Sequence, residues 1–254
     1  MKADLQLIYL IEELAANAWP AYIQQTLGQW RLRATFGITE RANSVYTVGN
    51  IPNNDNWLQI VEEFYQSRSI HPCFYVSDAS PSDLDGILEG KGYKKLDECF
   101  MMTAECAEIM DRVERNNRFT TKFILEADDA WIHEFILLGG FTLERHHAYS
   151  CIFSAIPFPK AFARIYENGE TIGLGTVVVE NGWACISNIV VHPAHQRKGV
   201  AAQLIRHLTE WAQKKGANGM YLQVIKNNIP AVTLYNKLGF VPISRHHYRT
   251  LQTF

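Results

Sequence analysis

The chain has 254 residues, of which 47% are hydrophobic and 20% are charged, as in a folded globular protein of one large or two ordinary domains. Its formal net charge of −2 gives no reason to expect a nucleic acid or an anionic membrane as a partner. Five cysteines, without a Cys-x-x-Cys pair, favour reduced thiols in a cytoplasmic protein over a disulfide framework.

The first half predicts short helices and strands joined by turns. Apolar residues at helical spacing predict a helix over residues 5–14, and the acidic Glu12 and Glu13 within it exclude a secretory signal and a membrane span. Residues 105–118 are charged and weakly apolar, and we expect a linker there. Hydrophobic patterns predict strands at 29–36, 44–48, 73–76 and 93–103, helices at 57–66 and 81–88, and a loop at 50–56.

The second half has clearer signals. Asn168-Gly169 is typical of a tight turn between two strands. Gly139-Gly140 would close one helix, and Gly216 and Gly239 two others. We expect loops between Gly139 and Ala161. The patterns predict helices at 128–138, 200–215 and 230–238, and strands at 161–166, 174–180, 183–191, 220–225 and 240–249.

The two halves also resemble one another. When the chain is shifted by 147 positions, both segments show a helix, a strand, a second helix, a Gly-aromatic pair and a strand in the same order. This repeat predicts two copies of one fold, at residues 1–115 and 116–254. Chance similarity between two α/β units is the alternative. The aligned residues are Glu63, Phe64, Gln66, Phe74, Gly92 and Tyr93 with Glu210, Trp211, Gln213, Tyr221, Gly239 and Phe240.

A basic, glycine-bearing loop at residues 196–201 connects the strand at 183–191 to the helix that follows. Backbone N–H groups at a helix N-terminus are unpaired and attract phosphate, and Gly199 lets an anion approach the backbone. Arg197 and Lys198 add positive charge or remain solvated. In the first copy the position of Gly199 holds Pro52, which has no N–H to offer, so we expect the second copy to hold the working site.

Two motifs then resemble the GNAT superfamily of acetyl-CoA-dependent N-acetyltransferases. Gln196-x-x-Gly199-x-Ala201 is similar to its pyrophosphate loop. The segment Asn228-x-x-Ala231-x-x-Leu234-Tyr235-x-Lys237-x-Gly239-Phe240 is similar to its second signature. The resemblance covers about residues 186–240. The first half matches only through the repeat, as a degenerate copy.

The resemblance implies an α/β (α+β) fold with two GNAT-like domains in tandem, each a mixed, mostly antiparallel sheet flanked by helices. The sheet of the second domain would splay near residues 188–191 to admit acetyl-CoA as cosubstrate. Acetyl transfer to a primary amine would proceed directly in a ternary complex. The acceptor, a small molecule or a protein amine, would meet loops at 139–161 and the first half of the chain.

The same resemblance assigns roles to residues. Tyr235 would donate a proton to the departing thiolate, with packing on an amphipathic helix as the alternative. A backbone N–H of Ile189 or Val190 would polarise the thioester carbonyl. Asn228 would contact the cofactor, cap the next helix, or do both. Residues expected to bind the cofactor are Ile189, Val190, Val191, Gln196, Arg197, Lys198, Gly199, Val200, Ala201 and Asn228.

The general base stays open. Glu144, His146, His147 and Glu180 are candidates, and a water relay would need none of them. The nine histidines and five cysteines lack the spacing of a zinc site, so we expect no metal. A different class of function is also open: a module that binds acyl-CoA without turnover, although pure binding has no need of a phenol at Tyr235. Oligomeric state is not predicted.

Overall fold

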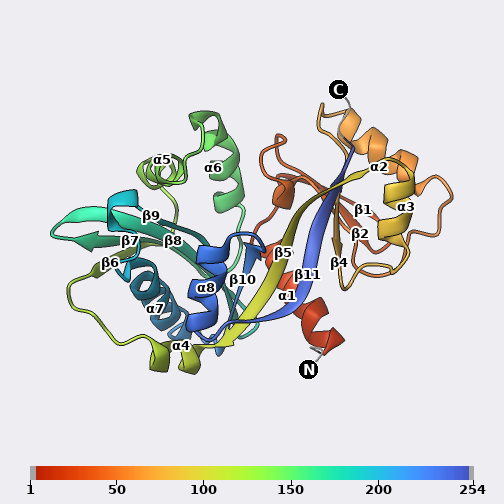
Figure 1. Ribbon diagram of the computed structural model, residues 1–254. Helices are drawn as coiled ribbons and strands as arrows, with labels where there is room; N and C mark the ends of the chain where they lie inside the picture. The colour runs from red at the N-terminus through yellow and green to blue at the C-terminus, as the bar shows by residue number, and fades with distance from the viewer. Residues whose placement is uncertain (1–3, 252–254) are drawn as a thin grey trace. The chain divides into compact units, whose positions relative to one another are not determined.

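The computed structural model describes residues 4–251, apart from the side chain of Asp97. These residues divide into two compact units (Figure 1). Unit 1 comprises residues 4–101, 225–227 and 243–251, and unit 2 comprises residues 102–224 and 228–242. The division therefore differs from the expected domains 1–115 and 116–254, since residues 243–250 of the last strand belong to unit 1 and residues 102–115 belong to unit 2. No described helix is both long and apolar enough to cross a membrane, and none of the cysteines forms a disulfide.

Unit 1 contains a mixed sheet with the strand order β1-β2-β3-β4-β11-β5. Antiparallel pairs join β1 to β2, β2 to β3 and β4 to β11, whereas β3 and β4 are parallel. The strands are β1 (Ile23–Leu27), β2 (Trp30–Ala34), β3 (Val45–Tyr46), β4 (Cys73–Ser77), β5 (Lys94–Glu105) and β11 (Val241–Thr250). The helices are α1 (Leu5–Asn17), α2 (Trp57–Gln66) and α3 (Leu84–Gly90), with a 3-10 turn at Glu40–Ala42.

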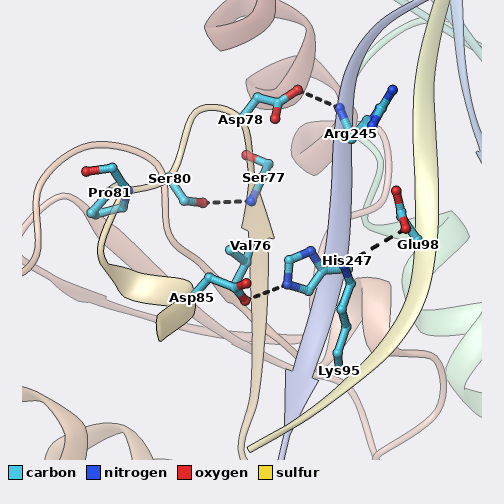
Figure 2. Close-up of a pocket in the computed structure, with 11 residues that line it drawn as sticks. Val76, Ser77, Asp78, Ser80, Pro81, Asp85, Lys95, Glu98, Arg245 and His247 are labelled. Atoms are coloured by element: carbon cyan, nitrogen blue, oxygen red, sulfur yellow. Dashed lines mark hydrogen bonds and ion pairs between the residues drawn. The ribbon is translucent and has the colours of Figure 1, made fainter. Parts of the chain in front are cut away.

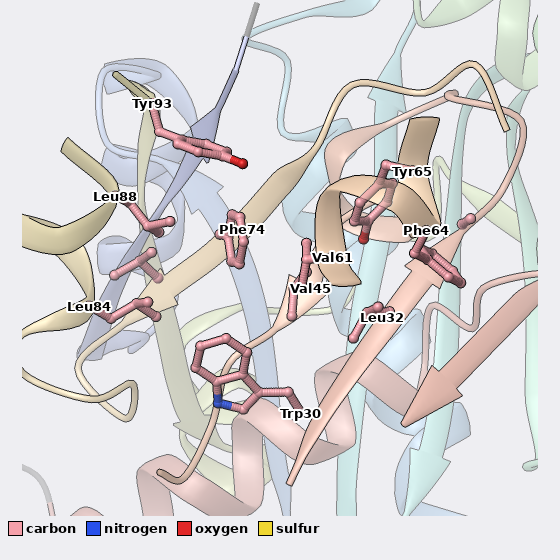
Figure 3. Close-up of a cluster of buried hydrophobic side chains, with 12 residues drawn as sticks. Trp30, Leu32, Val45, Val61, Phe64, Tyr65, Phe74, Leu84, Leu88 and Tyr93 are labelled. Carbon is pink, nitrogen blue, oxygen red and sulfur yellow. The ribbon is translucent and has the colours of Figure 1, made fainter. Parts of the chain in front are cut away.

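Alternating side chains on β4 divide the core of unit 1 between the two faces of its sheet. Phe74 and Val76 belong to a cluster with residues of α2 and α3, which Figure 3 shows around Trp30. Cys73 and Tyr75 belong to a second cluster, which includes Ala16 of α1. Helix α1 therefore covers one face of the sheet, and α2 and α3 cover the other.

A carboxyl group lies inside this core. Glu12 of α1 is 1% exposed, and its oxygens accept hydrogen bonds from Ser77 Oγ at 2.7 Å and Ser244 Oγ at 3.4 Å. Burial disfavours the charged carboxylate and raises the pKa of Glu12 to about 8, and the nearby charge of Asp78 acts in the same direction. Glu12 is therefore protonated in the folded protein at neutral pH.

We expect this carboxyl group to make unit 1 less stable as pH rises. The folded-state pKa of Glu12 lies above its unfolded value, so protonation stabilises the fold fully below about pH 4.5, and this contribution is lost as pH approaches 8. Thermal melts of Glu12→Gln should show a smaller fall in Tm between pH 6 and pH 9 than wild type, because an amide cannot ionise. The exposed neighbour variant Glu13→Gln is the control. Equal slopes for all three proteins would contradict the assignment.

The C-terminal strand is fixed to unit 1 by charge as well as by pairing. Arg249 of β11 is 5% exposed and donates to Asp85 Oδ1 at 2.7 Å and to Glu89 Oε1 at 3.3 Å, both on α3. His247 Nε2 lies 2.7 Å from Asp85 Oδ1 beside a cavity of about 390 Å³, where Figure 2 shows the two side chains facing each other. The hydrogen bond from Arg249 lowers the pKa of Asp85 to about 2.

Removing the Asp85 charge should loosen β11 in a pH-dependent way. Because the pKa of Asp85 is lower in the folded protein than in the unfolded chain, the carboxylate stabilises the fold above about pH 4. This stabilisation is lost as the pH falls towards 2. The carboxylate is 41% exposed, so solvent screening limits the effect. Asp85→Asn should lower the Tm at pH 7 by about 2–4 °C, the equivalent of about 1 kcal/mol, and by less at pH 3. The exposed Asp83→Asn should match wild type. A constant difference across pH would argue against the ion pair.

Unit 2 contains a mixed sheet with the strand order β10-β9-β8-β7-β6, in which all pairs except β9–β10 are antiparallel. Helices α5 and α6 lie over one face and α7 over the other (Figure 1). The strands are β6 (Thr120–Ile124), β7 (Lys160–Glu167), β8 (Glu170–Glu180), β9 (Trp183–Val191) and β10 (Gly219–Ile225). The helices are α4 (Cys106–Arg112), α5 (Asp129–Leu138), α6 (His146–Ser154), α7 (Val200–Gln213) and α8 (Ile229–Lys237), with 3-10 turns at Leu143–Arg145 and Pro193–His195.

Two predictions made from sequence were wrong. The expected linker at 105–118 begins with helix α4, which packs on α7. Arg206 of α7 donates to Met110 O at 2.8 Å, and Gln203 Nε2 donates to Glu114 O at 2.6 Å. The expected loops between Gly139 and Ala161 contain helix α6, whose buried residues include Tyr149 and Phe153. Helix α4 is short and rich in polar residues, so tertiary packing stabilises it. The buried residues of α6 recur at helical spacing, a signal that the sequence prediction did not use.

The other predicted elements are present to within a few residues, and the strand at 183–191 is confirmed without change. Strands β1 and β6 were not predicted, because β1 is mostly exposed, no residue of β6 is fully buried, and both lack an apolar stripe. The shift of 147 positions places α2 on α7, β4 on β10, α3 on α8 and β5 on β11. The order of elements in the sequence repeat is thus also the order of elements in the structure.

Candidate functional site

The sheet of unit 2 opens between β9 and β10. The two strands pair at three positions only, where Trp183, Ala184 and Cys185 face Gly219, Met220 and Tyr221. Beyond Cys185, no pairing between them occurs in the described chain. On its other side β9 remains paired with β8 as far as Val191. The residues of β9 after Cys185 therefore present one open backbone edge, which agrees with the splay expected near residues 188–191.

The loop after β9 supplies unpaired backbone donors. Arg197 and Gly199 have positive φ angles of 57° and 82°, and α7 begins at Val200 without a side-chain cap. Among the described residues, the amides of residues 197–202 have no hydrogen-bond acceptor. The first turn of a helix leaves such amides unpaired, and its dipole makes their end positive. A series of free N–H groups in this geometry is suited to bind an anion.

Helix α8 carries the third part of the site. Asn228 caps it, with Oδ1 accepting from Ala231 N at 3.3 Å. Tyr235 is half-buried beside Phe240, with 5.8 Å between ring centroids. Burial raises the pKa of Tyr235 to about 12, so the phenol is protonated at neutral pH. Gly239 has a φ of 96° and ends the helix, and Phe240 is buried, as expected for helix termination and core packing.

These three parts line one groove of about 850 Å³ within unit 2. It brings together most of the residues predicted to bind a cofactor, together with Tyr235. Val190 and Lys198 do not line it. The predicted residues that do are Ile189, Val191, Gln196, Arg197, Gly199, Val200, Ala201, Asn228 and Tyr235.

Sequence reasoning missed several residues of this groove. His195 lines it, with Nδ1 lying 3.1 Å from Glu167 Oε2. Most of the others are small or apolar residues on the first turns of α7 and α8, which the helical spacing from Gly199 and Asn228 could have indicated. The missed lining residues are His195, Ala202, Ile229, Pro230, Ala231, Thr233, Leu234 and Lys237.

None of the four candidate bases lines the groove. Glu144 is exposed in the turn before α6, and Glu180 ends β8. His146 Nε2 lies 3.6 Å from Asp129 Oδ1, and His147 Nε2 lies 3.8 Å from Cys151 Sγ. The groove therefore extends from the loop at residues 196–201 to Tyr235, and none of these four side chains lines it. Within the described range, no group of three His, Cys, Asp or Glu side chains is placed to hold a metal ion.

Comparisons with known proteins agree with this geometry. A family model described as "Probable histone acetyltransferase Rv0428c C-terminal" matches residues 7–251. The chain is 51% identical to the uncharacterized N-acetyltransferase YobR of Bacillus subtilis, over 94% of this chain and 96% of that protein. The chain belongs to the GNAT family of N-acetyltransferases. It is an acyltransferase by that membership.

Solved structures show the same fold for this acetyltransferase. A GCN5-related N-acetyltransferase from Kribbella flavida superimposes with a TM-score of 0.72 at 13% identity, over 96% of both chains. A tandem GNAT protein from the clavulanic acid biosynthesis pathway superimposes with a TM-score of 0.65 at 11% identity, over 95% of this chain and 87% of that one. At such low identity these likenesses concern the fold alone.

The positive φ of Gly199 allows a direct test of whether the loop at residues 196–201 binds coenzyme A. A Cβ at this position would meet no atom within 4 Å, but L side chains rarely adopt a φ of 82°. Gly199→Ala should therefore weaken coenzyme A binding about tenfold by titration calorimetry, through a distorted loop and a methyl group in the groove. The control is Gly86→Ala in α3, where a Cβ also has open space and φ is not positive. Unchanged affinity in Gly199→Ala would contradict a role for this loop.

Proposed function

We propose that this acetyltransferase transfers the acetyl group of acetyl-CoA directly to a primary amine, in a ternary complex within the groove of unit 2. The observation that carries the proposal is that one groove holds an open strand edge, unpaired helix-terminal amides and a protonated phenol. GNAT acetyltransferases use acetyl-CoA as cosubstrate, and each of these parts suits a different part of that molecule.

The pyrophosphate of coenzyme A would bind the amides of residues 197–202. These donors have no other acceptor among the described residues, so an anion would satisfy several of them together. The side chain of Arg197 lines the same groove and would add a charge-assisted contact. Gln196 donates to Val191 O at 3.3 Å, which fixes the start of the loop against the end of β9.

The pantetheine arm would lie along the open edge of β9. Its amide groups can pair with backbone as an added strand would, and β10 does not occupy this edge after Cys185. A backbone N–H at Ile189 or Val190 would then donate to the thioester carbonyl. A donor that is already in place stabilises the negative charge that develops on this oxygen during attack by the amine.

Tyr235 would donate its proton to the leaving thiolate. The pKa of about 12 keeps the phenol protonated throughout the physiological range. An ordinary thiol has a pKa of about 8.5, and the same desolvation that raises the pKa of the phenol also makes a thiolate more basic. Because desolvation raises both pKa values, the difference between the phenol and the thiol stays about what it is in water. Deprotonation of the amine would proceed through water, since no candidate base lines the groove.

The corresponding region of unit 1 is filled by side chains. The repeat aligns Pro52 with Gly199, and Pro52 is buried. Ile51, Trp57 and Leu58 pack against the core cluster that includes Trp30. This packing supports the proposal that, of two GNAT-like copies in tandem, only the second binds coenzyme A.

The acceptor class is a primary amine. A segment of this chain is 33% identical to the [ribosomal protein bS18]-alanine N-acetyltransferase of Escherichia coli K12, over 34% of this chain and 60% of that protein. Another is 31% identical to the streptothricin acetyltransferase of Streptomyces lavendulae, over 32% of this chain and 44% of that protein. Their names specify quite different acceptors, so these two likenesses do not favour one acceptor.

Replacing the phenol tests the mechanism. With acetyl-CoA and the best amine of a panel, Tyr235→Phe should lower kcat about 100-fold while coenzyme A binds as in wild type, because only the acid is removed. Tyr166→Phe, a tyrosine of β7 outside the groove, should retain wild-type kcat. If Tyr235→Phe matches wild type with a good amine, Tyr235 is not the acid. If wild type binds acetyl-CoA but acetylates no amine, the proposed reaction fails.

A further inference from the structure

Strand β9 contains an irregularity at the point where it leaves β10. Ser187 faces Thr176 and Val190 faces Leu174 on β8, so Asn188 and Ile189 both lie opposite Gly175. Two residues opposite one constitute a β-bulge, which bends the strand and changes the direction of the backbone groups that follow. The bulge comes just before Val191, which lines the groove together with Ile189.

Asn188 occupies the strained position of the bulge. Its φ of 57° is in the left-handed region, where asparagine is tolerated better than most residues. Its Nδ2 donates to Thr176 Oγ1 at 3.0 Å. Thr176 is 1% exposed, so its hydroxyl oxygen depends on a protein partner. The bond thus joins the bulge of β9 to the buried interior of β8.

Two glycines on β8 leave little freedom for another arrangement. A Cβ at Gly173 would lie 2.8 Å from Val190 O, and a Cβ at Gly175 would lie 2.8 Å from Ile189 Cδ1. The contact at Gly173 is with backbone, so β8 approaches β9 there too closely for any side chain, whereas the contact at Gly175 is with the end of the Ile189 side chain. The residues after Asn188 are therefore restrained by the close approach of β8 at Gly173 and by the hydrogen bond between Asn188 and Thr176.

We propose that Asn188, through its hydrogen bond to Thr176, is a positioning residue that directs the N–H groups after the bulge at the thioester carbonyl. The inference rests on the proposed function and concerns geometry only, since neither side chain lines the groove. Glycine would accept the same φ, but it has no amide to bond Thr176 and would leave the bulge free to flatten. Asparagine supplies both the conformation and the restraint.

Matched substitutions separate the bond from the backbone conformation. Thr176→Val keeps a β-branched side chain and removes the acceptor, Thr176→Ser restores a hydroxyl, and Asn188→Gly keeps the positive φ without the amide. We expect kcat about tenfold lower in Thr176→Val and Asn188→Gly, with the double variant no lower than either. Thr176→Ser should recover kcat to within about twofold. The Kd of coenzyme A, which has no acyl carbonyl, should change less than about threefold in all of them.

A second buried threonine controls for general damage. Thr209 of α7 is fully buried and donates to Ile205 O at 2.8 Å, so Thr209→Val removes a similar hydroxyl elsewhere in unit 2. It should lower Tm without lowering kcat. Wild-type kcat in Thr176→Val would overturn the inference and leave the proposed function standing, as would an equal loss in Thr209→Val. Absence of transfer by the wild-type protein would instead refute the proposed function.

Discussion

The feature on which the site depends is the end of backbone pairing between β9 and β10. A strand inside a sheet uses both edges for hydrogen bonds, and a buried edge without partners is costly. Here β9 remains paired with β8 along one edge, and its pairing with β10 along the other edge ends at Cys185. The free edge, the loop at residues 196–201 and the start of α7 then follow in a continuous path. The groove is therefore a consequence of strand geometry, and side chains such as Tyr235 are added to it.

Desolvation raises the pKa of one group in each unit, but only Tyr235 lines a groove. In unit 2 it raises the pKa of Tyr235, which keeps a proton in the groove. In unit 1 it raises the pKa of Glu12, which holds a neutral carboxyl group among serines in the core. The first group has no hydrogen-bond partner among the described residues and faces space for a ligand. Glu12 has its hydrogen-bond partners within the protein. In this chain the shifted pKa therefore indicates a ligand site only at Tyr235, where a groove lies beside the group.

The sequence predicted local structure correctly where the residues that determine it lie within one short stretch of the chain. The loop at 196–201 and the segment 228–240 each lie within one short stretch, and Gly199 and Gly239 have the positive φ angles that their positions required. The sheets are mixed and mostly antiparallel, as the family resemblance implied. Strand β6 was missed because it is a short edge strand with few apolar residues, whereas helix α6 was missed although its buried residues Ala148, Tyr149, Ile152 and Phe153 recur at helical spacing. The bulge at Asn188 was also missed, since its partners Thr176 and Gly175 lie on another strand.

The sequence predicted the last strand, β11, but not that it pairs with β4 of unit 1. Pattern alone cannot say which sheet a strand joins, and β11 pairs with β4, more than 160 residues earlier. Two contacts explain why β11 joins the sheet of unit 1. Arg249 of β11 donates to Asp85 of α3, and Ser244 of β11 donates to the buried carboxyl group of Glu12. Unit 1 cannot complete its sheet until the end of the chain is available. Contacts of such sequence separation form slowly, so unit 1 depends for its folding on residues that follow the segment 228–240 in the chain.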